Sequence, residues 1–305
     1  MIKFEKTLNK NSVLTFSHSG ELVAGTKNGI TLYNTRDFSC FMRFDHQSDI
    51  GHILFSQNDE ILATKDFQGL IRMYSINSQT HIHTFHSIDK RDGSNFVFSP
   101  DDEYIIDGDW GGNIRLLNLK TFEKKILQTL PNCMINSVSL DLKNGEVIFT
   151  IFYKGGLSIY DPQYYYLSYF NYIDGTLVWV KDGNKIPEFL LGPIVEQSLR
   201  RIVFFNQGSS KKYEIQIYDL DFTKLIVSIP LGDVRCAKKN ISISSGGKYL
   251  IVNYMDSIRI YDTKEYELVV LLNIDGLIRF SYDDRIVSVC SSDGKCFISS
   301  LNHLV

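Results

Sequence analysis

The chain has little of what several classes of protein require. No apolar run approaches the roughly 18 residues that cross a bilayer, and the opening MIKFEKTLNKNS lacks the apolar core of a signal peptide. Basic residues number 32 against 35 acidic ones, so no excess of positive charge is present to attract a phosphate backbone. We therefore expect a cytoplasmic protein that binds neither membrane nor nucleic acid.

Cysteine is also scarce. The five cysteines include no CxxC pair, which is typical of reduced thiols in a reducing compartment. Cys290 and Cys296 lie closest in the sequence, and a two-residue turn at Asp293-Gly294 would place them on opposite faces of a hairpin. We expect no disulfide between them.

The motifs that carry common catalytic chemistry are missing. Neither GxxxxGK[ST] nor GxGxxG is present to bind phosphate, and GxSxG, the turn that holds a hydrolase nucleophile, is absent as well. The seven histidines are scattered along the chain. We expect no cofactor, no metal and no catalytic site.

What the sequence does contain is a repeat. The segments FSHSGELV (16–23), FSQNDEIL (55–62), FSPDDEYI (98–105) and FSYDDRIV (280–287) are alike, and weaker copies start at 140 and 243. Each copy precedes an alternating run, and one further run, IQIYD, lies between the fourth and sixth; in chain order the seven runs are ITLYN, IRMYS, IRLLN, LSIYD, IQIYD, IRIYD and CFISS. Apolar residues alternate with polar ones between Gly, Asp, Asn and Ser turns, which predicts short strands.

Units of about 40 residues with four strands each are typical of propeller blades. We therefore predict an all-β chain with one domain over residues 1–305, a single seven-bladed β-propeller of four-stranded antiparallel blades. The last unit lacks an outer strand, and residues 2–8 are expected to supply it and close the ring. A step of 58 residues predicts an insertion of about twenty residues in the fifth blade, around 181–200. Leu177–Val180 and Arg201–Phe205 are then its first and second strands.

Two segments carry a resemblance to a known family. FSPDDEYIIDGDWGGNIRLLN (98–118) resembles one unit of the WD-repeat β-propellers, and HQSDIGHILFS (46–56) resembles their inter-blade His segment with the strand that follows. The Trp-Asp pair of the family is replaced here by Tyr-Asp, Tyr-Asn, Tyr-Ser or Leu-Asn, so the chain resembles a divergent member. The resemblance implies a non-catalytic scaffold that binds proteins.

Four aromatic residues occupy similar places in the repeats. Each lies seven residues before the next-to-last residue of an alternating run: Phe67, Trp110, Tyr153 and Tyr254. We expect them on turns around the channel mouth, where exposed aromatic rings anchor a peptide or a partner domain. In the alternative interpretation, each ring packs onto a neighbouring loop.

We thus predict a protein-interaction scaffold that is a monomer by itself, with a protein or peptide partner. Two other functions stay open. One is a propeller enzyme, a hydrolase or oxidoreductase that uses His52 and acids such as Asp49 at the channel mouth. The other is a sensor whose aromatic residues stack on a planar or sugar-like small molecule.

Overall fold

The computed structural model describes residues 6–8, 13–26, 29–37, 39–87, 94–141, 146–153, 165–171, 176–179, 194–196, 200–207, 213–219, 224–232, 240–254, 257–274, 276–291 and 296–300. Within these residues the regular structure is all strand, with no helix. No helix there is long and apolar enough to cross a membrane.

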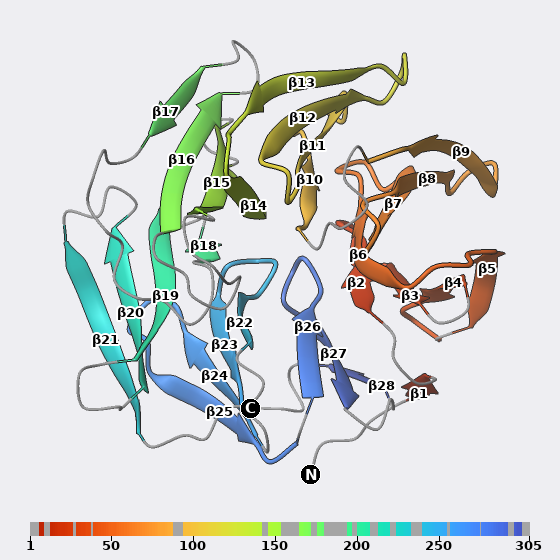
Figure 1. Ribbon diagram of the computed structural model, residues 1–305. Coiled ribbons are helices and arrows are strands. Elements are labelled where there is room, and N and C mark those ends of the chain that lie inside the picture. The colour runs from red at the N-terminus through yellow and green to blue at the C-terminus, as the bar shows by residue number, and fades with distance from the viewer. Residues whose placement is uncertain are drawn as a thin grey trace. The chain divides into compact units, whose positions relative to one another are not determined.

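The strands form antiparallel four-stranded sheets, drawn as neighbouring arrows in Figure 1. Within each sheet, the strands are given in the order in which they lie side by side. The first three sheets are β2 (Leu14–Phe16), β3 (Leu22–Thr26), β4 (Ile30–Asn34), β5 (Cys40–Phe44); β6 (Ile50–Phe55), β7 (Ile61–Asp66), β8 (Ile71–Ser75), β9 (Thr80–Phe85); and β10 (Phe96–Phe98), β11 (Tyr104–Gly108), β12 (Asn113–Asn118), β13 (Lys124–Thr129). The other four are β14 (Cys133–Asp141), β15 (Glu146–Tyr153), β16 (Tyr165–Asn171), β17 (Leu177–Trp179); β18 (Ile194–Glu196), β19 (Arg201–Gln207), β20 (Tyr213–Asp219), β21 (Leu225–Gly232); β22 (Asn240–Ile243), β23 (Tyr249–Asn253), β24 (Ile258–Asp262), β25 (Leu268–Leu272); and β26 (Gly276–Phe280), β27 (Ile286–Ser291), β28 (Cys296–Ser300), β1 (Lys6–Leu8).

Five of these sheets contain the complete repeat turn between their first and second strands. In each, the Oγ of a buried serine accepts a backbone N–H of the following strand region at 2.9–3.1 Å. The serines are Ser17, Ser56, Ser99, Ser244 and Ser281. The residue three positions later has a positive φ of 53–74°: Gly20, Asp59, Asp102, Gly247 and Asp284.

The number of blades predicted from the sequence is therefore wrong. The sheets that begin with β14 and β18 have Asp141 and Gln197 in place of the serine, so they are not copies of this unit. The structure has seven four-stranded sheets, but only five of them are blades of the repeat type, so it does not support a single ring of seven such blades. Sequence spacing missed the difference because alternating runs recur in every sheet, whereas the turn that defines the unit does not.

The chain folds as two compact units. The first comprises Met1–Thr64, Met73–Ile82 and Val234–Val305, and the second comprises Lys65–Arg72 and His83–Asp233. In the first unit, Ile298 of β28 packs with Leu14 and Phe16 of β2. In the second, buried residues of β11, β12 and β14 form one cluster, which includes Ile106, Ile114 and Ile135.

Three local expectations concern strand pairing. Lys6–Leu8 pairs antiparallel with β28 and so provides the outer strand of that sheet. Leu177–Trp179 pairs with β16 as an outer strand, and Ile194–Glu196 is the first strand beside β19; the structure thus corrects the assignment of 177–180. Most of the expected insertion, 181–193 and 197–199, lies outside the described residues.

The expected separation of Cys290 and Cys296 is also wrong. The two residues are direct partners in the β27–β28 ladder, and Val289 pairs with Phe297. The observed register differs by one residue from the one that a two-residue turn at Asp293-Gly294 would give.

In the first unit, a hydrogen-bonded histidine lies beside the core. His46 Nδ1 and the Tyr74 hydroxyl are 3.0 Å apart, and Ser48 Oγ lies 2.9 Å from His46 Nε2. His46 and Tyr74 are both buried, and the Tyr74 ring packs 4.7 Å from that of Phe44. A tyrosine at the end of the repeat therefore supplies both apolar packing and a polar contact.

Candidate protein-interaction site

Two turns in the second unit have the same architecture. They connect β7 to β8 and β11 to β12, and each begins with an aspartate followed by an aromatic residue: Asp66-Phe67 and Asp109-Trp110. The backbone of Asp66 makes hydrogen bonds with Leu70 (3.1 Å) and Gly69 (2.9 Å). The backbone of Asp109 does the same with Asn113 (3.0 Å) and Gly112 (3.1 Å).

The Asp66 carboxylate holds its turn from inside. Its Oδ1 accepts the backbone N–H groups of Gln68 at 3.0 Å and Leu70 at 2.9 Å. Its Oδ2 accepts a hydrogen bond from Arg72 Nη1 at 2.9 Å. The carboxylate therefore fixes both the loop and the arginine of the next strand, while the neighbouring Phe67 is exposed.

The Asp109 carboxylate acts in the same way. Its Oδ1 accepts the Asn113 backbone N–H at 2.8 Å, and Arg115 Nη1 lies 3.5 Å from its Oδ2. Gly112 has φ +83°, and a Cβ there would collide with the carbonyl oxygen of Leu130. Only glycine fits this turn without strain.

A buried ion network lies beside the second turn. Lys65 Nζ donates to Asp107 Oδ1 at 2.6 Å, to Ser94 Oγ at 2.9 Å and to the Gly108 carbonyl at 3.1 Å. The other carboxylate oxygen of Asp107 accepts a hydrogen bond from Arg115. Lys65 and Asp107 are completely buried, so each charge depends on these partners.

The positive and negative side chains of the two turns and the ion network are equal in number. Three cations contact three carboxylates: Lys65, Arg72 and Arg115 with Asp66, Asp107 and Asp109. Because the six charges compensate one another, the turns present aromatic side chains on a rigid support without net local charge.

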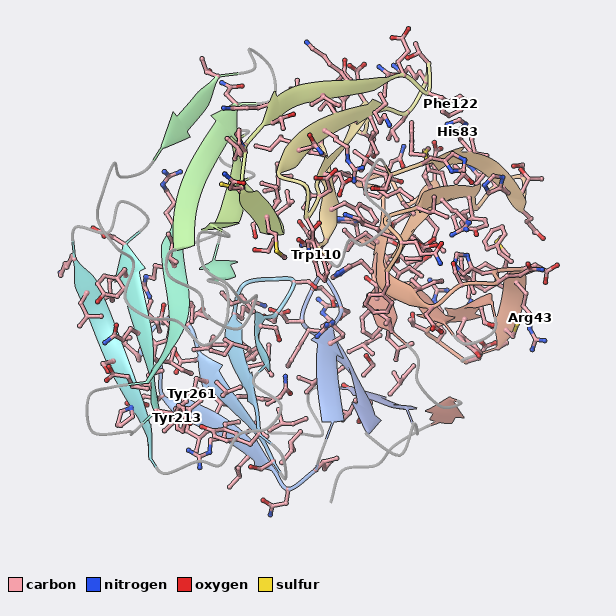
Figure 2. The ribbon with its side chains drawn as sticks, viewed as in Figure 1. Arg43, His83, Trp110, Phe122, Tyr213 and Tyr261 are labelled. Carbon is pink, nitrogen blue, oxygen red and sulfur yellow. The ribbon has the colours of Figure 1, made fainter. Side chains whose placement is uncertain are left out.

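The two aromatic residues differ in exposure. Phe67 is 58% exposed, the highest value among the large hydrophobic residues that the structure describes. Trp110, labelled in Figure 2, is half-buried. Phe67 and Trp110 therefore occupy equivalent places on two turns of one unit, as the sequence spacing predicts.

Tyr254 does not belong to this set. Its N–H donates to the carbonyl of Ser257 at 2.7 Å, as those of Asp66 and Asp109 do in their turns, so Tyr254 corresponds to the aspartate and not to the aromatic residue. This turn is one residue shorter than the other two, so a distance of seven residues counted back from the third strand reaches the aspartate position here and the aromatic position there. Tyr254 is 1% exposed, and the Arg259 guanidinium lies over its ring, 4.5 Å from the centroid.

Tyr153 is the last residue of β15 and pairs with Cys133 of β14. Its side chain lies outside the described part of the chain. Tyr153 belongs to the second unit and Tyr254 to the first.

His52 and Asp49 are the residues that the alternative enzyme hypothesis would use. His52 is half-buried in β6, and Asp49, just before that strand, is exposed. Among the described residues, no group of three or more His, Cys, Asp or Glu side chains is arranged to hold a metal ion.

Sequence reasoning missed the Asp–Arg pairs, although a signal was present. Residues 66–72 read DFQGLIR and residues 109–115 read DWGGNIR, so an aspartate precedes an arginine by six positions in both turns. The partnership of Lys65 with Asp107 had no such signal, because it joins strands 42 residues apart.

The fold is that of a β-propeller. The chain is similar in structure to the β-propeller domain of Cps50 (Swd1) from Myceliophteria thermophila, with a TM-score of 0.75 and 11% identity over 98% of this chain and 99% of that one. A scan against protein-family models and a search of curated proteins both find no match.

Proposed function

We propose that this protein is a non-catalytic scaffold of the WD-repeat type, which binds a protein or peptide partner on the Phe67 and Trp110 turns. The proposal rests on one observation: the most exposed large hydrophobic residue among those described, Phe67, lies on a turn whose backbone is held by the buried Asp66 carboxylate. A preorganised aromatic residue loses little entropy on binding and is a common energetic anchor of interfaces.

The buried state of Tyr254 fits the alternative in which the ring packs within the protein, so Tyr254 supports its own turn rather than a partner. Tyr153 stays a predicted anchor. The compensated charges around the two turns favour an uncharged, apolar segment of the partner. Binding should therefore change little between low and high salt.

The experiment compares partner capture by the wild-type protein with capture by a Phe67→Ser/Trp110→Ala variant, followed by affinity measurement with the main captured protein. We expect at least about a tenfold loss of affinity for the variant, the range for removal of one strong anchor. Phe41→Ser is the control, because Phe41 is 41% exposed on a different strand, β5.

Thermal unfolding separates binding from packing. An unchanged melting temperature with lost capture supports the proposal. Undiminished capture by the double variant contradicts it, and a large fall in melting temperature indicates that the rings pack within the protein instead.

A further inference from the structure

The outer strand β25 has an unusual edge. It is the last strand of its sheet, next to β24, and all five residues Leu268–Leu272 are apolar. Every other described outer strand of five or more residues contains a charged residue, a histidine or a proline, which discourages pairing with another chain. These residues are Arg43 in β5, His81 and His83 in β9, Lys124 and Lys125 in β13, and Pro230 in β21.

The side chains of β25 divide between core and surface. Val270 and Leu272 belong to the buried cluster of the first unit. Leu268, Val269 and Leu271 are 50%, 38% and 52% exposed. Three neighbouring large apolar residues on this outer strand form an apolar surface without the charged residue, histidine or proline of the other outer strands. The β24–β25 ladder has a bulge at Val269, between the pairs Ile260–Val270 and Tyr261–Leu268.

The strand complements itself. If two antiparallel copies pair around Val270, Val269 of one copy lies opposite Leu271 of the other, and the same contact occurs twice. Side chains of directly opposed residues lie on the same face, so these four exposed residues would form one apolar cluster. Glu267 lies opposite Asn273 in this register, so no two like charges meet next to the paired strand.

We propose that the β25 edge is a homodimer interface, in which two copies of this chain pair β25 with β25 antiparallel about a twofold axis at Val270. This isologous contact closes after two subunits, because each edge is used up by the other. It uses none of the residues of the Phe67 and Trp110 turns. A single strand pair buries less than about 1,200 Å², so we expect a weak dimer that forms at micromolar concentrations.

The test is sedimentation analysis of the wild-type protein over a concentration series from about 1 to about 200 μM, which spans the range expected for a weak interface. We expect a shift from monomer to dimer. The Leu271→Glu variant should stay monomeric, because two carboxylates would enter the shared apolar cluster. The variant should fold, since residue 271 lies opposite Arg259 in its own sheet.

Ile126→Glu is a matched control. Ile126 is 42% exposed on the outer strand β13 and lies opposite Arg115, as Leu271 lies opposite Arg259. This variant should dimerise like the wild type. Three results would overturn the proposal: a wild type that is monomeric throughout, a Leu271→Glu variant that still dimerises, or a loss of dimer in Ile126→Glu with retained folding.

Discussion

Lys65 and Asp107 form an ion pair in which both side chains are completely buried and the charged atoms lie 2.6 Å apart. Lys65 joins β7 to β11, and its three N–H donors have three acceptors. A buried pair of this kind contributes less as an attraction than it costs when one partner is removed, because the remaining charge is left without compensation.

The first prediction follows from this pair. Lys65→Met should lower the free energy of unfolding by about 1–3 kcal/mol, the cost of lost hydrogen bonds to a buried charged group, because Asp107 then keeps only Arg115 as its cation. Urea denaturation measures it. Lys120→Met is the control: the Lys120–Glu103 pair is 75% and 45% exposed, and such surface pairs contribute at most about 1 kcal/mol. Equal losses in both variants would contradict the prediction.

The second prediction concerns Asp59, which lies in the first unit. Its carboxylate accepts the backbone N–H groups of His18 at 2.7 Å and Ser19 at 2.8 Å. Burial raises the pKa of Asp59, but the hydrogen bonds from His18 and Ser19 outweigh burial and bring the pKa below its ordinary value. Since the folded state binds its proton less tightly than the unfolded state, Asp59 stabilises the fold above pH of about 4, and this stabilisation is lost as the pH falls through the lowered pKa.

Asp59→Asn should therefore lower stability at pH 7 by about 1–3 kcal/mol, the cost of impaired hydrogen bonds to a half-buried charged group. The difference from the wild type should shrink below pH of about 4, where the wild-type carboxyl also takes up its proton. Unfolding curves at several pH values measure the difference. A difference that is constant from pH 7 to pH 3 would show that the charge of Asp59 is not responsible.

Asp284 behaves in the opposite sense, although it holds the corresponding position of another repeat turn. Its carboxylate accepts hydrogen bonds from Ser244 and Gly246 at 3.1 and 3.0 Å, yet burial raises its pKa. The folded state then binds the proton more tightly, so this group reduces stability as the pH rises from the ordinary to the raised pKa. We expect the pH dependence of unfolding to be weaker in Asp284→Asn over that window, and an unchanged profile would argue against it.

The fourth prediction concerns Tyr74. Tyr74→Phe keeps the ring that packs on Phe44 but removes the hydroxyl beside His46 Nδ1. The buried imidazole nitrogen loses a partner, so the free energy of unfolding should fall by about 1–2 kcal/mol. Tyr282→Phe is the control, because Tyr282 is 38% exposed. Thermal and urea unfolding measure the change. Both variants keep their rings, so if ring packing alone mattered, Tyr74→Phe would lose no more stability than Tyr282→Phe.

The fifth prediction tests the contact between Arg259 and Tyr254. A double-mutant cycle with Arg259→Met and Tyr254→Leu should give a coupling energy of about 1 kcal/mol, as expected for a partly desolvated cation over an aromatic ring. Additive losses in the cycle would mean that the two residues stabilise the turn independently.

The sequence by itself determined the local structure: alternating runs separated by turn residues specify antiparallel strands, and the segments around Ser56 and Ser99 predict the turns that the structure shows. It also located Phe67 and Trp110 correctly at the start of two equivalent turns. These features depend on residues near one another in the chain, so their pattern is visible in the sequence.

The tertiary structure alone decided the register and the partners. In the structure, Tyr254 lies at the aspartate position of its turn, and Cys290 lies opposite Cys296 in the β27–β28 ladder. Only five sheets contain the complete repeat turn, and Lys65 forms an ion pair with Asp107. A turn shorter by one residue leaves the alternating pattern almost unchanged but moves every side chain beyond it, and a buried charge finds its counter-charge through packing between sheets rather than through spacing along the chain.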